Sequence, residues 1–312
     1  MNDRATMIVA PLARWSSRIA LFSACVLLVD VVLHRLTPFP TPVAVNLFAV
    51  GVAGGGLAVL VGLIAMIQIW RKGYGGAGSA AFGVLLPFIA LAWPLTYVPA
   101  YLNLPPINDV STDFASPPQF LALAKQRKGE SASVAYPGAR FAAAQQKAYP
   151  ELRSFVVDRP AAEAFELVEE AVRKLKWRVA TSEPPVTGRG AKPGILEATD
   201  TTLVAGFTDD VVVRVEGSVN RSRIDVRSAS RYGVHDLGAN ATRVRRFFAE
   251  LQTRIDSTSP GAGGRRGLRT TRAGAMVKKA KGRDQEKAEA RNGRARVQSS
   301  AQRVRGQKET QR

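Results

Sequence analysis

The sequence predicts a membrane anchor of three helices followed by an α+β domain, in which a mostly antiparallel sheet carries two helices packed on one face. Three apolar stretches, at about residues 19–36, 43–70 and 82–101, lie in the first third of the chain. A helix needs about 20 apolar residues to cross a bilayer. Later segments alternate apolar and polar residues as strands do, or repeat apolar residues at the spacing of an amphipathic helix.

Basic residues near the span ends predict the orientation of the anchor at 19–102. The segment 1–18 contains three arginines and the loop after the second span contains Arg71 and Lys72, whereas 101–119 contains neither Lys nor Arg. Cytoplasmic loops carry an excess of Lys and Arg. The sequence therefore predicts a multi-pass protein of the cell inner membrane with a cytoplasmic N-terminus and a periplasmic C-terminal domain.

Small residues on the second span indicate how the helices of the anchor pack. Gly54, Ala58 and Gly62 are four apart and share one face of this helix. Small residues at this spacing let helix backbones approach closely. The spacing fits packing among the three spans, and a homo-oligomer formed through the same face is the alternative.

The segment at 103–148 is expected to be a Pro-rich stalk and linker. It contains the pairs Pro105-Pro106 and Pro117-Pro118, and proline pushes the preceding residue toward extended backbone. From Phe120 onward it is rich in Ala, Gln and Lys. We expect an extended stalk followed by a linker with two short helices, which together would connect the anchor to the domain at 149–257.

The domain is predicted to have the element order β-α-β-β-β-β-α. Strands are expected at 154–157, 177–180, 195–201, 209–216 and 223–230. A helix starts near Pro160 and keeps one apolar stripe as far as Leu175, and a final helix, capped by Asn240, carries another as far as Ile255. The last two strands alternate strictly, so one face of each is expected to pack on a core and the other to meet solvent.

Net charge separates the domain from the end of the chain. Residues 257–312 hold 16 basic and 4 acidic side chains, whereas residues 145–256 hold 18 and 16. The tail at 258–312 has few large apolar residues, and such a segment is expected to be disordered. Its charge suits anionic envelope components, while the nearly neutral domain is not expected to bind nucleic acid.

Six polar residues gather around the end of the last strand, the loop after it and the start of the final helix. A helix N-terminus beside guanidinium groups can bind an anion, so this group is a candidate ligand-binding site. Parity places Arg227 on the solvent-facing side of its strand. Asp236 could equally pair with Arg231 or Arg243 and fix the loop, and we favour this structural interpretation over a ligand site. The six residues are Arg227, Ser230, Arg231, Asp236, Asn240 and Arg243.

No catalytic residue, metal ligand or cofactor is predicted. The single cysteine, Cys25, lies in the first span, so His235 has no cysteine nucleophile to serve. Asp209 and Asp210 are adjacent on a strand and point to opposite faces, which makes a poor acid/base pair. No spacing typical of metal ligands occurs. These observations lean away from an enzyme.

Three motifs carry a resemblance to a known family. They are Pro105–Asp113, Phe207–Val215 and Asp225–Arg243. Together they resemble the domain of unknown function family fourteen ninety-nine, which is bacterial and plastid and is often preceded by membrane spans. The resemblance covers about 104–251 and excludes the basic tail. It implies a domain identity and no mechanism.

The leading hypothesis is a non-enzymatic, membrane-anchored envelope protein whose extracytoplasmic domain binds a partner or an anionic ligand. An envelope enzyme acting on a lipid or glycan is the alternative, with Arg227, Arg231 and Asp236 as its polar centre. A second alternative is a membrane protein that tethers nucleic acid through the basic tail, which requires a cytoplasmic tail.

Overall fold

The computed structural model describes residues 8–127 and 133–258. Its first three helices are long and apolar enough to cross a membrane, which confirms the three apolar helices predicted at the N-terminus. They are α1 (Pro11–Leu36), α2 (Thr41–Lys72) and α3 (Ala77–Leu95). Almost all of the basic tail predicted at 258–312 lies outside the described residues.

The small residues of α2 pack against α1. The hydroxyl of Ser16 donates a hydrogen bond of 2.8 Å to the carbonyl oxygen of Ala58. A Cβ atom added to Gly54 would lie 2.3 Å from the Ser23 hydroxyl oxygen, and one added to Gly62 would lie 2.7 Å from that of Ser16. These glycines therefore allow the two backbones to approach closely.

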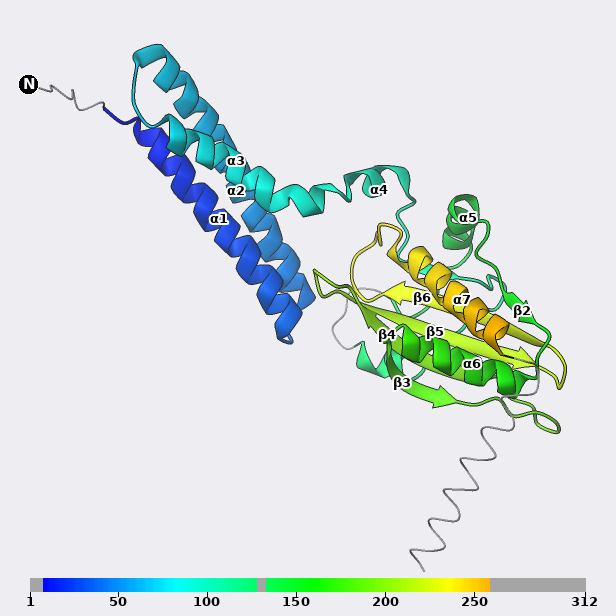
Figure 1. Cartoon of the computed structure of the whole chain (residues 1–312). Helices are drawn as coiled ribbons and strands as arrows, with labels where there is room; N and C mark the ends of the chain where they lie inside the picture. The colour runs from blue at the N-terminus through cyan, green and yellow to red at the C-terminus, as the bar shows by residue number, and fades with distance from the viewer. Residues whose placement is uncertain (1–7, 128–132, 259–312) are drawn as a thin grey trace, which may run out of the picture. The chain divides into compact units, whose positions relative to one another are not determined.

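The domain is built on an antiparallel sheet of six strands in which β1-β6-β5-β4-β3 are neighbours and β2 also pairs with β6. Helices α6 (Ala161–Lys174) and α7 (Ala239–Ser257) cover one face, as Figure 1 shows. From β2 onward the order is β-α-β-β-β-β-α, as predicted. The strands are β1 (Asp109–Ser111), β2 (Phe155–Val157), β3 (Arg178–Glu183), β4 (Gly194–Thr201), β5 (Thr208–Gly217) and β6 (Ser222–Ser230).

The main core lies between the sheet and its two helices. Val211, Val213 and Val215 alternate along β5 and are fully buried against the helices, where they meet Val168 of α6 and Phe247 of α7. Every second residue of a strand points the same way. The alternation predicted for β5 therefore places these three valines on the face that packs against the helices.

The opposite face of the sheet does not meet solvent, contrary to the expectation. Residues 112–127 and 133–136, which we together call the cover segment, lie over it and include the short helix η1 (Leu123–Gln126). Phe120 and Leu123 form a second apolar core with Val212 and Ala229. These two strand residues would otherwise expose apolar surface, so covering them is favourable.

The segment expected to be a stalk therefore contributes to the domain. Its strand β1 pairs with β6, with Asp109 opposite Ala229 and Ser111 opposite Arg227. Along the chain, helix α4 (Val98–Asn103) comes before β1 and helix α5 (Ala139–Ala148) comes after it. Proline-rich composition predicted extended backbone correctly, but it could not predict that part of this backbone pairs with the sheet.

The two edges of the sheet differ. At the β1 edge, the buried side-chain amide of Gln145 in α5 accepts a hydrogen bond from the Ser111 backbone N–H at 2.9 Å and donates one to its carbonyl oxygen at 2.8 Å. At the other edge β3 pairs only with β4, with a bulge between Val179 and Thr181. Five of the six β3 residues are exposed.

Candidate functional site

The six predicted site residues lie on both faces of the sheet. Ser230, Asp236, Asn240 and Arg243 lie on the face covered by α7, whereas Arg227 and Arg231 make their contacts on the face of the cover segment. The structure thus divides the six residues between two separate clusters, which we call the α7-side cluster and the cover-side cluster.

Arg243 is the centre of the α7-side cluster. Its guanidinium donates to the carboxylates of Asp200 at 2.8 Å and Asp209 at 2.6 Å, and to Ser228 and Asn240 at 3.1 and 2.7 Å. Burial disfavours the charged form, but the two carboxylates outweigh it and raise the pKa of Arg243. The guanidinium therefore stays charged and fully engaged inside the domain.

Asn240 connects the strand end to the helix. Its side-chain amide donates to the hydroxyl of Ser230 and to the backbone carbonyl of Asn108, each at 3.0 Å, while its oxygen accepts from Ser228 at 2.7 Å. Asn240 is fully buried. All of its polar atoms have protein partners, so it holds β6, α7 and the residue before β1 together.

Asp236 caps α7, in place of the expected Asn240. Its carboxylate accepts the backbone N–H groups of Gly238 and Asn240, each at 2.9 Å. The two guanidinium groups expected to pair with it bind elsewhere, since Arg231 binds Asp210 and Arg243 binds Asp200 and Asp209. The loop is therefore fixed by helix capping and not by an ion pair of Asp236.

The Asp236→Asn variant is expected to change the free energy of unfolding by less than about 1 kcal/mol, because Asn caps helices about as well as Asp, whereas Asp236→Ala should cost about 1–2 kcal/mol. Thermal unfolding of both variants in nanodiscs measures the difference. A loss above about 2 kcal/mol for the Asn variant would show that the carboxylate charge itself is required.

The stability difference between the parent and Asp236→Asn is predicted to depend on pH. Burial raises the pKa of Asp236, although the N–H groups of Gly238 and Asn240 oppose the rise. The native state then takes up a proton at higher pH than the unfolded chain, so the parent gains stability as pH falls through the native pKa. Relative to Asp236→Asn, the parent should become more stable between neutral pH and about pH 4.

Arg227 is the centre of the cover-side cluster and is only 1% exposed. Its guanidinium binds both carboxylate oxygens of Asp109, the shortest contact being 2.7 Å, and donates to the carbonyl oxygens of Pro118 and Val134 at 3.2 and 2.8 Å. The prediction that Arg227 faces solvent is wrong, because the cover segment lies over this side of β6.

Two aromatic rings enclose the guanidinium of Arg227. Its central carbon lies 4.8 Å from the ring centre of Phe120 and 5.5 Å from that of Tyr136. Burial and the carboxylate of Asp109 raise the pKa of Tyr136 to about 12, so this ring stays neutral. Cation–π contacts strengthen when the cation is shielded from water, so these rings stabilise the buried charge.

A second buried ion pair lies beside the first. The carboxylate of Asp210 accepts from Arg127 at 2.6 Å and from Arg231 at 2.8 Å, and Arg127 also donates to the carbonyl oxygen of Ser133 at 3.0 Å. Asp209 binds Arg243 on the other face. The two adjacent acids therefore point to opposite faces, as the alternation of the strand predicted.

Sequence reasoning missed Glu197. Its fully buried carboxylate accepts the backbone N–H groups of Leu121, Ala122 and Leu123 at 2.8, 3.0 and 2.8 Å. This single side chain holds the start of η1 against β4. Its charge between the apolar residues Leu196 and Ala198 was the available signal, but its partners lie 74–76 residues away in the sequence.

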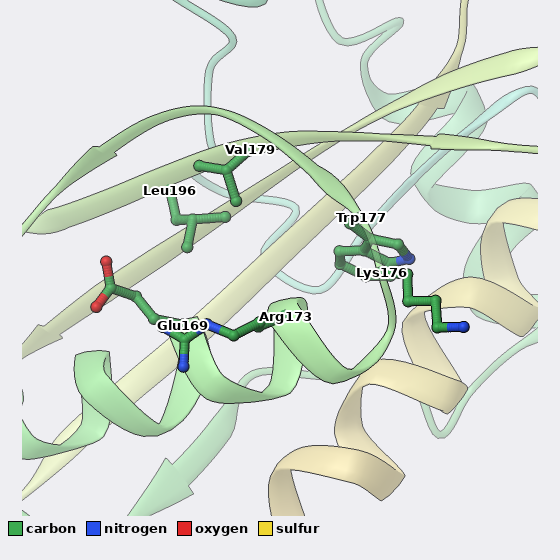
Figure 2. A pocket seen from close by; sticks show the side chains of 6 residues that line it. All are labelled: Glu169, Arg173, Lys176, Trp177, Val179 and Leu196. Atoms are coloured by element: carbon green, nitrogen blue, oxygen red, sulfur yellow. The ribbon is translucent and has the colours of Figure 1, made fainter.

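A surface cavity of about 210 Å³ lies elsewhere, between α6 and the β3 edge. Figure 2 shows the side chains of Val179 and Leu196 on the strands and those of Glu169 and Arg173 on α6. None of the six predicted residues lines it, nor do they line a second cavity at the β5–β6 turn. The full lining is Glu169, Arg173, Lys176, Trp177, Val179 and Leu196.

Comparison with known proteins identifies the domain and no activity. No curated protein matches this chain, and neither does any solved structure. One family model matches residues 109–251, a range that begins at β1 and includes the cover segment. The domain is thus similar to the family described as "Protein of unknown function (DUF1499)", which confirms the resemblance carried by the three sequence motifs.

Proposed function

We propose that this is a membrane-anchored envelope protein whose domain lies in the periplasm and binds a partner protein through the β3 edge of its sheet. The observation that carries this proposal is the contrast between the two sheet edges. Gln145 occupies the backbone groups of Ser111 at the β1 edge, whereas β3 has no second neighbouring strand among the described residues.

An open edge strand offers unpaired backbone N–H and C=O groups to an extended segment of another protein. Beside this edge lies the cavity in which Trp177 is 7% and Val179 48% exposed. An apolar side chain of an added strand would fit between these two residues. The proposed partner therefore presents an extended segment with an apolar side chain.

The polar clusters around Arg227 and Arg243 are poorly suited to bind a substrate or an anion, which directs the proposal to the edge of the sheet. The guanidinium groups of Arg227 and Arg243 are each engaged by buried carboxylates and further acceptors. Guanidinium groups that are hydrogen-bonded in this way stabilise the fold and are not available to bind a substrate. An anion would have to displace a buried carboxylate to reach either arginine.

The location is tested with reporters fused after α7 of the full anchor and domain. Alkaline phosphatase is active only in the periplasm and a green fluorescent protein exported in unfolded form stays dark there. We expect an active phosphatase fusion and a dark fluorescent fusion, following the positions of Arg71 and Lys72. The reverse pair of results would place the tail in the cytoplasm and favour nucleic-acid tethering.

Partner binding is tested with a photo-crosslinking residue at Val179 in living cells. A matched control carries it at Val219, which is 68% exposed in the turn between β5 and β6. We expect a discrete protein adduct at Val179 that is absent at Val219. The same adduct should disappear when Ala180 is changed to Lys, since an edge lysine opposes strand addition. Equal adducts from both sites would overturn the proposal.

A further inference from the structure

The loop between β4 and β5 presents apolar side chains on an ordered turn. Leu203 is 84% exposed and Val204 is 40% exposed. Two hydrogen bonds between Thr202 and Phe207 close the base of the turn. The Thr202 N–H donates to the carbonyl oxygen of Phe207, and the Phe207 N–H donates to the hydroxyl oxygen of Thr202, each at 2.9 Å. The loop is thus built to hold two apolar side chains outward.

This loop contacts the last turn of α1. The Arg35 guanidinium donates to the carbonyl oxygen of Leu203 at 3.1 Å. The His34 ring lies 5.3 Å from that of Phe207 and its Nδ1 is hydrogen-bonded to the carbonyl oxygen of Ala205. A Cβ atom on Gly206 would meet the carbonyl oxygen of His34 at 3.2 Å. A side chain here would be tightly placed against α1, and the φ of +77° at Gly206 also favours glycine.

The depth of this contact in the membrane follows from the topology. α1 ends at Leu36, and three consecutive spans place this end on the same side as the end of α3, from which the domain emerges. The last turn of a spanning helix lies at the bilayer surface, where Arg35 can reach lipid phosphates. A loop hydrogen-bonded to that turn lies at the same depth.

We propose that the β4–β5 loop is a membrane contact, in which Leu203 and Val204 enter the interfacial region of the bilayer beside the end of α1. The apolar surface of these two side chains would be removed from water by acyl chains, which favours the contact. The proposal needs no particular compartment, because the loop and the end of α1 share a side in either orientation.

The test uses the full chain in phosphatidylcholine nanodiscs, with the single native cysteine removed by Cys25→Ser. A polarity-sensitive nitrobenzoxadiazole probe is attached through Val204→Cys in one protein and through Val219→Cys in the control. The control site is 68% exposed and lies at the far end of the ten-residue β5, about 33 Å away.

We expect the probe at position 204 to emit at shorter wavelength, to resist quenching by aqueous iodide and to be quenched several-fold by lipids carrying a spin label near the acyl-chain head. The probe at 219 should show the opposite pattern. Adding Leu203→Ser should weaken lipid quenching at 204 while leaving the melting temperature unchanged.

Three results would overturn the proposal. Equal iodide quenching at positions 204 and 219 would show that the loop stays in water. Protection from iodide without quenching by spin-labelled lipids would show that protein covers the loop, either a second copy of the chain or another partner. A large fall in melting temperature for Leu203→Ser would show that this side chain packs within the fold.

Discussion

The Arg227→Ala variant is expected to lose about 3–5 kcal/mol of unfolding free energy, because removing one partner of a buried ion pair leaves the other as an uncompensated charge. Asp109 would keep its buried position without the guanidinium that binds both of its oxygens. The carbonyl oxygens of Pro118 and Val134 would lose a donor as well. Thermal and denaturant unfolding of the full chain in nanodiscs measures the loss.

Arg223→Ala provides the matched control on the same strand. Its side chain is 43% exposed, and its carboxylate partners Asp113 and Asp225 are also bound by Arg214. We therefore expect a loss below about 1 kcal/mol, as for exposed ion pairs. If Arg227→Ala and Arg223→Ala had the same melting temperature, the buried ion pair would contribute nothing to stability and Arg227 would be available to a ligand.

The double variant Asp109→Leu with Arg227→Met separates charge from packing. Replacing a buried ion pair by apolar residues of similar volume is often neutral or stabilising. We expect the double variant to recover most of the stability lost by Arg227→Ala. Failure to recover would show that the hydrogen bonds from Arg227 to Pro118 and Val134 carry most of the stabilisation.

The Glu197→Ala variant is expected to release the start of the cover segment from the sheet. Three backbone N–H groups at 121–123 would lose their acceptor, and hydrogen bonds to charged groups contribute about 1.5–3 kcal/mol each. The expected loss is on the order of 3 kcal/mol or more. Amide hydrogen exchange at 121–123 should accelerate, and protease should cut within 112–127 first.

The control for this variant is Glu183→Ala on the exposed edge strand β3, which should leave exchange at 121–123 unchanged. Glu197→Gln should fall between the parent and Glu197→Ala, because its amide retains one acceptor oxygen. If exchange in the cover segment stayed at the parent rate in Glu197→Ala, the apolar contacts of Phe120 and Leu123 would hold the segment alone.

The elements of the domain could be predicted from the sequence because their signals are local. The apolar stripes of α6 and α7 and the alternation of β5 depend on neighbours within a few residues. The second face of the sheet could not be predicted in this way. Alternation reports that Val212 and Arg227 share a side, but not whether that side meets water or the cover segment.

The grouping of the six candidate residues into one cluster was wrong for a related reason. Asn240 and Arg243 were correctly placed near Ser230, because strand end and helix start adjoin along the chain. Arg227 was grouped with them by sequence distance, although its partner Asp109 is 118 residues away. Long-range ion pairs leave no periodic signal, so a cluster assembled from one stretch of sequence mixed the two faces of a strand.

The incorporation of the expected stalk into the sheet limits how far the domain can travel from its anchor. Only five residues separate α4 from β1, a distance of at most about 18 Å when fully extended. A tether of the 46 residues at 103–148 would have let the domain search the space above the bilayer. With so short a connection the domain cannot reach targets far from the bilayer, and any partner that it recognises must come to the membrane surface.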